Sequence, residues 1–117
     1  MKGKGNTNMS PHKDRRLARR VATTIPIKPV EGSGWMIAHD LSVGGMQVTT
    51  TAPRWPGTLI PIRFRLPKSK QFLCMTARVI GLVDVPHGVG LSLQFLRLAP
   101  ESDEAIRRYV STQQLAA

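Results

Sequence analysis

The sequence is poor in cysteine, aromatic residues and acidic residues, and it has no long apolar run. Its single cysteine, Cys74, excludes a disulfide within the chain, which is typical of proteins in a reducing compartment. Cys74 lies in an apolar stretch, which predicts a small side chain buried in the core. The three histidines, His12, His39 and His87, are scattered along the chain. The sequence therefore predicts no metal site.

Membrane and export signals are also missing from the pattern. No stretch approaches the roughly 18 consecutive apolar residues that suggest a membrane-spanning helix. The first ten residues carry lysines but no apolar segment of the kind found in secretory signals. We therefore expect a cytoplasmic protein without a membrane span.

Catalytic groups do not form a recognisable set. No histidine lies in a catalytic motif that would pair a nucleophile with a base. His39 precedes Asp40, but neighbouring residues of a strand point to opposite faces. Aromatic residues make up only 5%, and Trp35, Trp55 and Tyr109 form no evident platform for stacking nucleic-acid bases. These absences favour a non-enzymatic binding protein.

Positive charge is the most marked feature that is present. The chain has 17 Lys and Arg against 7 Asp and Glu, a formal net charge of +10. Residues 1–30 alone contribute +7 of this charge. Such a balance indicates an anionic partner, which leaves a nucleotide, a nucleic acid or an anionic membrane surface as candidates.

The 117 residues predict one domain. Short segments with β-branched residues and a period of two, separated by Gly- and Pro-containing turns, predict about six strands and a barrel or sandwich. The change of pattern after Pro100 predicts a helix. We expect a mainly β fold, a six-stranded antiparallel barrel with a C-terminal helix over one opening. The predicted boundaries are a flexible tail 1–13 and a domain 14–117, comprising an arm 14–20, a barrel 21–98 and a helix 101–114.

The first predicted strand carries two prolines, Pro26 and Pro29. Proline has no N–H to donate to a sheet, so this segment is predicted to be an edge strand or a strand end. The segment from Phe72 to Val83 is apolar on both faces, which favours a central strand.

Four arginines crowd into the arm, at positions 15, 16, 19 and 20. A guanidinium can meet O6 and N7 of guanine with two hydrogen bonds, stack on a base or fork onto a phosphate. Such a run is also common in solvated basic tails. The arginine run by itself therefore leaves both interpretations open.

A second motif follows about twenty residues later, Asp40-Leu41-Ser42-Val43-Gly44-Gly45. Asp40 can accept N–H groups from a guanine edge, and Ser42 adds a hydroxyl. Gly44 and Gly45 can adopt positive φ and allow a ligand to approach the backbone. Asp and Ser also cap turns routinely, so turn capping remains the alternative for this motif.

Together the two motifs resemble the PilZ domain, a bacterial receptor module for cyclic di-GMP. Its signature is an Arg-x-x-x-Arg arm followed by Asp/Asn-x-Ser-x-x-Gly, and here Arg16 to Arg20 and Asp40 to Gly45 match it. Arg15-x-x-x-Arg19 fits the first motif too, but Arg20 leads directly into the strand beginning at Val21. The resemblance extends from about Asp14 to the C-terminal helix, and the family fold is a six-stranded barrel with a C-terminal helix.

The resemblance implies a cyclic di-GMP receptor without enzymatic activity, metal or further cofactor. Arg16 and Arg20 would hold guanine and phosphate groups, and Asp40 and Ser42 would read a guanine edge beside Gly44 and Gly45. In that family an arginine at the position of Arg15 accompanies two intercalated ligand molecules. Ligand binding would order the arm and change a surface read by a downstream protein or by self-association, as monomer or homodimer, in motility or biofilm control. The alternative is a small basic nucleic-acid-binding β-barrel, whose affinity would fall steeply with salt.

Overall fold

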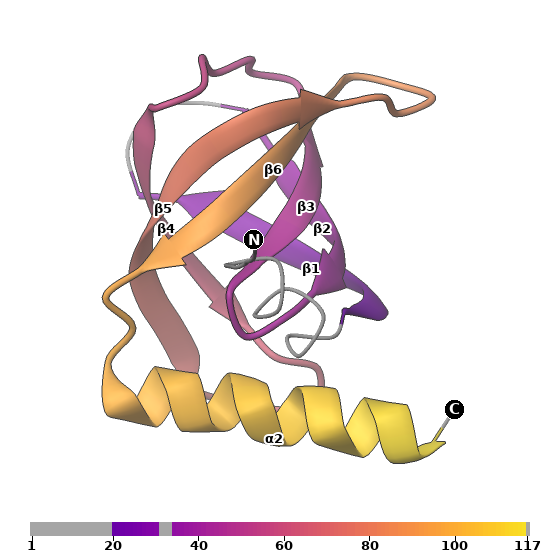
Figure 1. Cartoon of the computed structure of the whole chain (residues 1–117), viewed down its shortest axis with the longest axis vertical. Coiled ribbons are helices and arrows are strands. Elements are labelled where there is room, and N and C mark those ends of the chain that lie inside the picture. Colours follow the sequence, from indigo (N-terminus) through magenta and orange to yellow (C-terminus); the bar gives the residue numbers. More distant parts are fainter. Residues whose placement is uncertain (1–19, 31–33, 117) are drawn as a thin grey trace, which may run out of the picture.

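A computed structural model describes residues 20–30 and 34–116, and in this part the chain is mainly β. Six strands close into an antiparallel barrel that is followed by one helix, which confirms the predicted fold class (Figure 1). The predicted tail 1–13 and arm residues 14–19 lie outside the described residues. The strands are β1 (Val21–Pro29), β2 (Met36–Leu41), β3 (Gly45–Thr50), β4 (Leu59–Arg65), β5 (Phe72–Val83) and β6 (Val89–Leu96).

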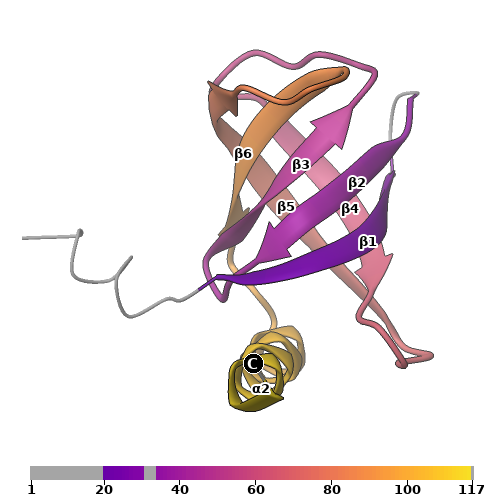
Figure 2. The ribbon, with the colours of Figure 1, turned by 90° about the vertical axis from the view of Figure 1, so that its right-hand side faces the viewer.

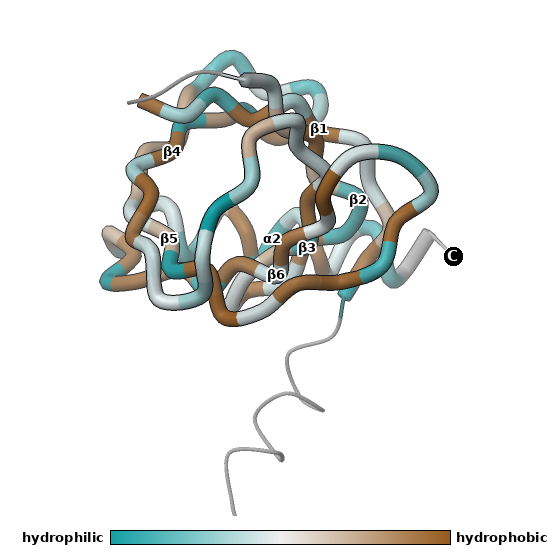
Figure 3. Tube along the Cα trace, turned by 90° about the horizontal axis from the view of Figure 1, so that it is seen from above, coloured by the Kyte–Doolittle hydropathy of each residue, from teal (hydrophilic) through white to brown (hydrophobic). Residues whose placement is uncertain are grey.

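The strands follow the order β1-β2-β3-β6-β5-β4 around the barrel. Strands next to each other in the sequence pair as antiparallel neighbours, except β3 and β4. Two further pairings join strands that are not consecutive in the sequence. β3 pairs with β6 over its whole length, from Gly45 opposite Gln94 to Thr50 opposite Val89. β1 pairs with β4, and this contact closes the ring that is seen from above in Figure 3.

The closing contact between β1 and β4 is short, and Pro26 explains where it ends. The paired residues are Lys28 with Arg63 and Pro29 with Ile62. Continuing this register would place Pro26 opposite Arg65, where a backbone N–H is required. Proline has none, so the ladder stops and the rest of β1 is paired only with β2. β1 is therefore an edge strand, as the prolines predicted, but only over the part that pairs with β2 alone.

Alternate residues of each strand fill the barrel interior, as a period of two requires. Ile60, Ile62 and Phe64 of β4 are at most 2% exposed, whereas Arg63 and Arg65 between and beyond them are exposed. Phe64 stacks on Phe95 of β6, with ring centroids 6.3 Å apart. This core fixes which side of each strand faces outward.

The helix α2 (Pro100–Ala116) lies across one end of the barrel (Figures 1 and 2). It begins one residue earlier and ends two residues later than the predicted range. Glu101 and Asp103 occupy its first turn, where carboxylates interact favourably with the helix dipole. Ile106 and Val110 are buried in the core. Among the residues that the structure describes, no helix has the length and apolarity to cross a bilayer.

Cys74 was predicted to lie in the core, and this prediction is wrong. The thiol is exposed on β5, while its neighbour Leu73 is 4% exposed and faces the interior. The surrounding run is apolar on both faces of the strand, so hydrophobicity alone could not reveal the side on which Cys74 lies. Phe72, Ile80 and Leu82 of the same strand are also exposed.

Candidate functional site

A β-bulge in β2 turns Asp40 to the outer side of the barrel. Ala38 and Asp40 are two residues apart in β2, yet they pair with the consecutive residues Val48 and Gln47 of β3. A regular strand would point Ala38 and Asp40 to the same face. The extra residue, His39, shifts the alternation, so Ala38 is fully buried and the Asp40 side chain is 21% exposed.

Because of this bulge, His39 and Asp40 do not point to opposite faces of the sheet, as neighbouring residues of a regular strand would. The His39 side chain is exposed, and its Nε2 forms a hydrogen bond with the Thr49 hydroxyl on β3. β1 has a matching irregularity between Ala22 and Ile25, directly opposite this position. The predicted site thus lies where two neighbouring strands both depart from regular pairing.

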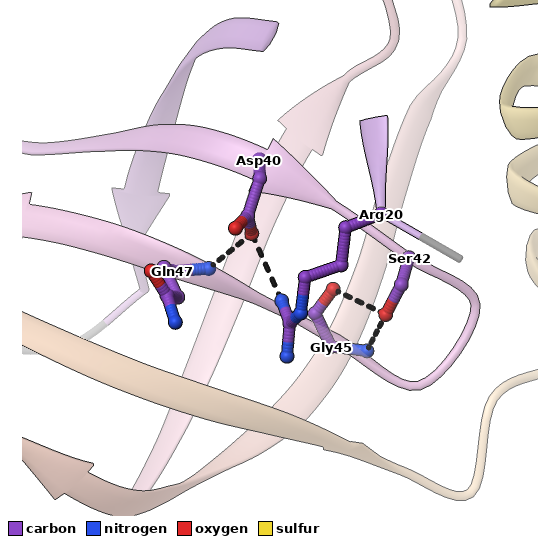
Figure 4. Close-up of polar contacts among 5 residues, drawn as sticks. All are labelled: Arg20, Asp40, Ser42, Gly45 and Gln47. Atoms are coloured by element: carbon purple, nitrogen blue, oxygen red, sulfur yellow. Dashed lines mark hydrogen bonds and ion pairs between the residues drawn. The ribbon is translucent and has the colours of Figure 1, made fainter. Parts of the chain in front are cut away.

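Asp40 holds together three segments of the site. Its Oδ1 accepts a hydrogen bond from Arg20 Nη1 at 2.9 Å and another from the Gln47 backbone N–H at 2.9 Å (Figure 4). No donor to Oδ2 is found among the described residues. Arg20 directly precedes β1, and its side chain is 39% exposed. The ion pair therefore sits at the junction of the arm and the barrel and is accessible from solvent.

Ser42 begins the turn between β2 and β3 and is 3% exposed. Its Oγ donates to the Gly45 carbonyl and accepts from the Gly45 N–H, both at 3.2 Å (Figure 4). The Ser42 N–H also donates to the Gly45 carbonyl at 2.8 Å. The turn-capping alternative therefore describes Ser42 in this structure, and the hydroxyl holds the turn in shape beside Asp40.

Gly44 and Gly45 do not take the positive φ values that the sequence suggested, and only Gly45 has a close backbone neighbour. A Cβ on Gly45 would lie 2.0 Å from the Leu93 carbonyl oxygen on β6. A Cβ on Gly44 would meet nothing within 4 Å. The Gly44 carbonyl accepts the Phe95 N–H at 2.9 Å. The second glycine is needed because β3 and β6 approach each other closely here.

The structure thus brings together Arg20, Asp40, Ser42 and Gly45 at one end of β1, β2 and β3. Gly44 lies in the same turn between β2 and β3. The remaining predicted site residues, Arg15 and Arg16, lie outside the described residues. Sequence reasoning missed the Gln47 backbone N–H, which has no signature in the side-chain pattern.

No cluster of three or more metal-ligating side chains occurs in the described part of the chain. The arrangement at Arg20 and Asp40 presents a guanidinium fork beside a carboxylate. Such a pair offers both donors and acceptors to one planar ligand edge.

Comparison with protein families gives a match to the PilZ domain over residues 14–112. Comparison with curated proteins gives no match. Among solved structures, the fold is similar to the inhibitor of motility MotI/DgrA from Bacillus subtilis, with TM-score 0.77 and 19% identity over 87% of this chain. It is also similar to YcgR from Escherichia coli in complex with c-di-GMP, with TM-score 0.72 and 20% identity over 87% of this chain.

This chain spans about half of both structures, 52% of the first and 47% of the second. The separate PilZ domain of YcgR with c-di-GMP is matched over 93% of its length, with TM-score 0.68 and 18% identity. The likeness to these structures lies in the fold. The family match covers both arginine and aspartate motifs, the whole barrel and most of α2. This chain belongs to the PilZ domain family.

Proposed function

We propose that this chain is a receptor for cyclic di-GMP and has no enzymatic activity of its own. The observation that carries the proposal is the Arg20–Asp40 pair, which the fold places at the base of the arginine arm beside the Ser42–Gly45 turn. Membership in the PilZ family supports it, as do the similar structures of YcgR and of its separate PilZ domain with c-di-GMP.

The chemistry of the pair suits a guanine. A carboxylate can accept the N–H groups of the Watson–Crick edge, and a guanidinium can donate to O6 and N7 or to a phosphate. Oδ1 of Asp40 already receives two hydrogen bonds, so a guanine would be received by Oδ2. Ser42 contributes by holding the turn, because its hydroxyl is engaged with Gly45.

The arm would supply the remaining cations. In this proposal Arg16 acts with Arg20 on guanine and phosphate groups, and Arg15 favours binding of two intercalated ligand molecules. Ligand would then order the arm against the barrel, an order–disorder change that a partner protein reads. The similar inhibitor of motility suggests motility or biofilm control as the setting. The exposed free thiol of Cys74 suits a reducing cytoplasm.

Isothermal titration of the purified chain with cyclic di-GMP, GTP and a short single-stranded RNA at two salt concentrations tests this proposal. We expect saturable binding of cyclic di-GMP alone. RNA binding that weakens steeply with salt, without binding of cyclic di-GMP, would instead support the nucleic-acid alternative. Turnover of a nucleotide by the pure protein would contradict the non-enzymatic assignment.

Two variants test the arm. Arg16→Ala is expected to cost about 2–3 kcal/mol of binding free energy, as for hydrogen bonds to charged groups, and wild-type affinity would contradict its role.

Arg15→Ala is expected to lower the stoichiometry from two ligands per chain to one. A wild-type stoichiometry of one would remove the intercalated pair from the proposal and leave the receptor assignment in place.

A further inference from the structure

A second basic surface lies on the barrel where β1 and β4 separate. A groove of about 700 Å³ opens between β1 and the β4–β5 connection. Figure 2 shows β1 and β4 diverging towards this connection, which projects beyond the end of the barrel. The described acidic residues are all absent from its lining, which includes five cationic side chains, Lys28, Arg63, Arg65, Lys68 and Lys70.

The cations of this groove repel one another, and a bound anion would offset this repulsion. Lys28 and Arg63 are direct cross-strand partners, and like charges in such pairs are destabilising. The guanidinium groups of Arg63 and Arg65 lie over the Phe72 ring, 4.8 and 5.2 Å from its centroid. The ring therefore keeps two guanidinium groups close together despite their repulsion. Both guanidinium groups therefore lie together at the lining of the groove.

The groove also offers apolar contacts and unpaired backbone. Ile25 and Leu66, which are 2% and 8% exposed, reach its lining from the core. Pairing between β1 and β4 covers only Lys28–Pro29 and Arg63–Ile62 among the described residues. Beyond that point β1 has no second partner strand in this part of the chain, whereas β4 continues only through Phe64 and Arg65. Pro26 has no N–H to donate to Arg65.

From these features we propose that the groove binds an extended segment of a partner protein in which acidic residues alternate with apolar ones. In an extended strand, alternate side chains point to opposite sides. One side would place carboxylates against the lysine and arginine side chains, and the other would rest on Ile25 and Leu66. The backbone of the segment would hydrogen-bond to a free strand edge, the mode called β-augmentation.

A peptide fits the groove better than a nucleic acid does. Single-stranded nucleic acids bind through bases stacked on aromatic rings, and Phe72 is the only aromatic side chain among the described residues that line this groove. Its ring already contacts two guanidinium groups. Free strand edges, by contrast, are used by peptides. The proposal does not depend on nucleotide binding, since none of the groove residues belongs to the Arg20–Asp40 site.

Fluorescence anisotropy with a labelled ten-residue peptide of alternating Glu and Val tests the proposal without any nucleotide. We expect it to bind at least about tenfold more tightly than the same peptide with Gln in place of Glu, because charge complementarity sets the choice of partner. A peptide with proline at two central positions is expected to bind more weakly, since it cannot donate backbone hydrogen bonds there. Equal binding of the Glu and Gln peptides, or no binding of the Glu peptide, would overturn the proposal.

The double variant Lys68→Gln/Lys70→Gln should weaken binding of the Glu peptide by about tenfold. Arg78→Gln is the matched control, because Arg78 is exposed on β5 but does not line the groove. Circular dichroism checks that the variants remain folded. Tighter binding of a ten-nucleotide oligo-dT than of the Glu peptide would overturn the peptide assignment. Titration of the same double variant with cyclic di-GMP separates the two proposals, because its affinity for the nucleotide should be unchanged.

Discussion

Arg20 Nη1 lies 2.9 Å from Asp40 Oδ1 across the interface between β1 and β2. Arg20 is the last residue before β1, and Asp40 is in the bulged part of β2. The pair therefore links Arg20, at the end of the arginine arm, to a residue of the barrel whose carboxylate also accepts the Gln47 backbone N–H. Because both side chains are partly exposed, a ligand can reach the pair without opening the core.

Replacing Arg20 by Ala should weaken the binding of cyclic di-GMP while changing the stability of the fold only slightly. Exposed ion pairs contribute less than about 1 kcal/mol to folding, so we expect only a small change in the midpoint of urea denaturation. Loss of a charged hydrogen bond to cyclic di-GMP should cost about 2 kcal/mol, or roughly 30-fold in Kd by titration. Arg108→Ala, on the outer side of α2, removes the same charge and is the control. Equal affinities of the two variants would exclude Arg20 from the site.

The two adjacent glycines should differ sharply when each is replaced by Ala. Gly45→Ala places a Cβ against the Leu93 carbonyl, and separating β3 from β6 should cost at least about 2 kcal/mol of unfolding free energy. Gly44→Ala has open space for its Cβ and should change stability by less than about 0.5 kcal/mol. Urea denaturation measures both. A stable Gly45→Ala protein would show that the strands can move apart easily.

Ser42→Ala should act on the turn between β2 and β3. The variant removes a buried hydroxyl and leaves the Gly45 N–H without its bond to Oγ, which should cost about 1–2 kcal/mol of unfolding free energy. Hydrogen exchange at the Gly45 amide should become faster as well. Ser111→Ala, on an exposed position of α2, serves as the control. Unchanged exchange at Gly45 would mean that Ser42 does not stabilise the turn.

Ile106→Ala tests how strongly α2 is anchored to the barrel. Ile106 is fully buried at the barrel end, and truncating such a side chain costs about 2–5 kcal/mol through lost contacts and a cavity. Thermal unfolding followed by circular dichroism measures the effect. Arg107→Ala, one residue further along α2 and exposed, should change stability by less than about 0.5 kcal/mol. Similar unfolding temperatures for the two variants would show that packing of α2 against the barrel contributes little to stability.

Much of the fold was predictable because strand patterns are local. The segment from Phe72 to Val83, which is apolar on both faces, was predicted as a strand, and β5 has this range. Gly and Pro marked the turns, and the change of pattern after Pro100 indicated the start of the helix. Family membership also followed from the sequence, since both motifs are short and contiguous.

The sequence by itself determined the strands, the turns, the helix and the two motifs, because each depends on residues close together in the chain. Tertiary structure decided the rest. The bulge at His39 sets the direction of Asp40, and only pairing of β2 with β3 reveals it. The approach of β6 makes Gly45 necessary, and this contact joins residues almost fifty positions apart. The outward side of Cys74 and the groove beside Pro26 likewise depend on which strands become neighbours when the barrel closes.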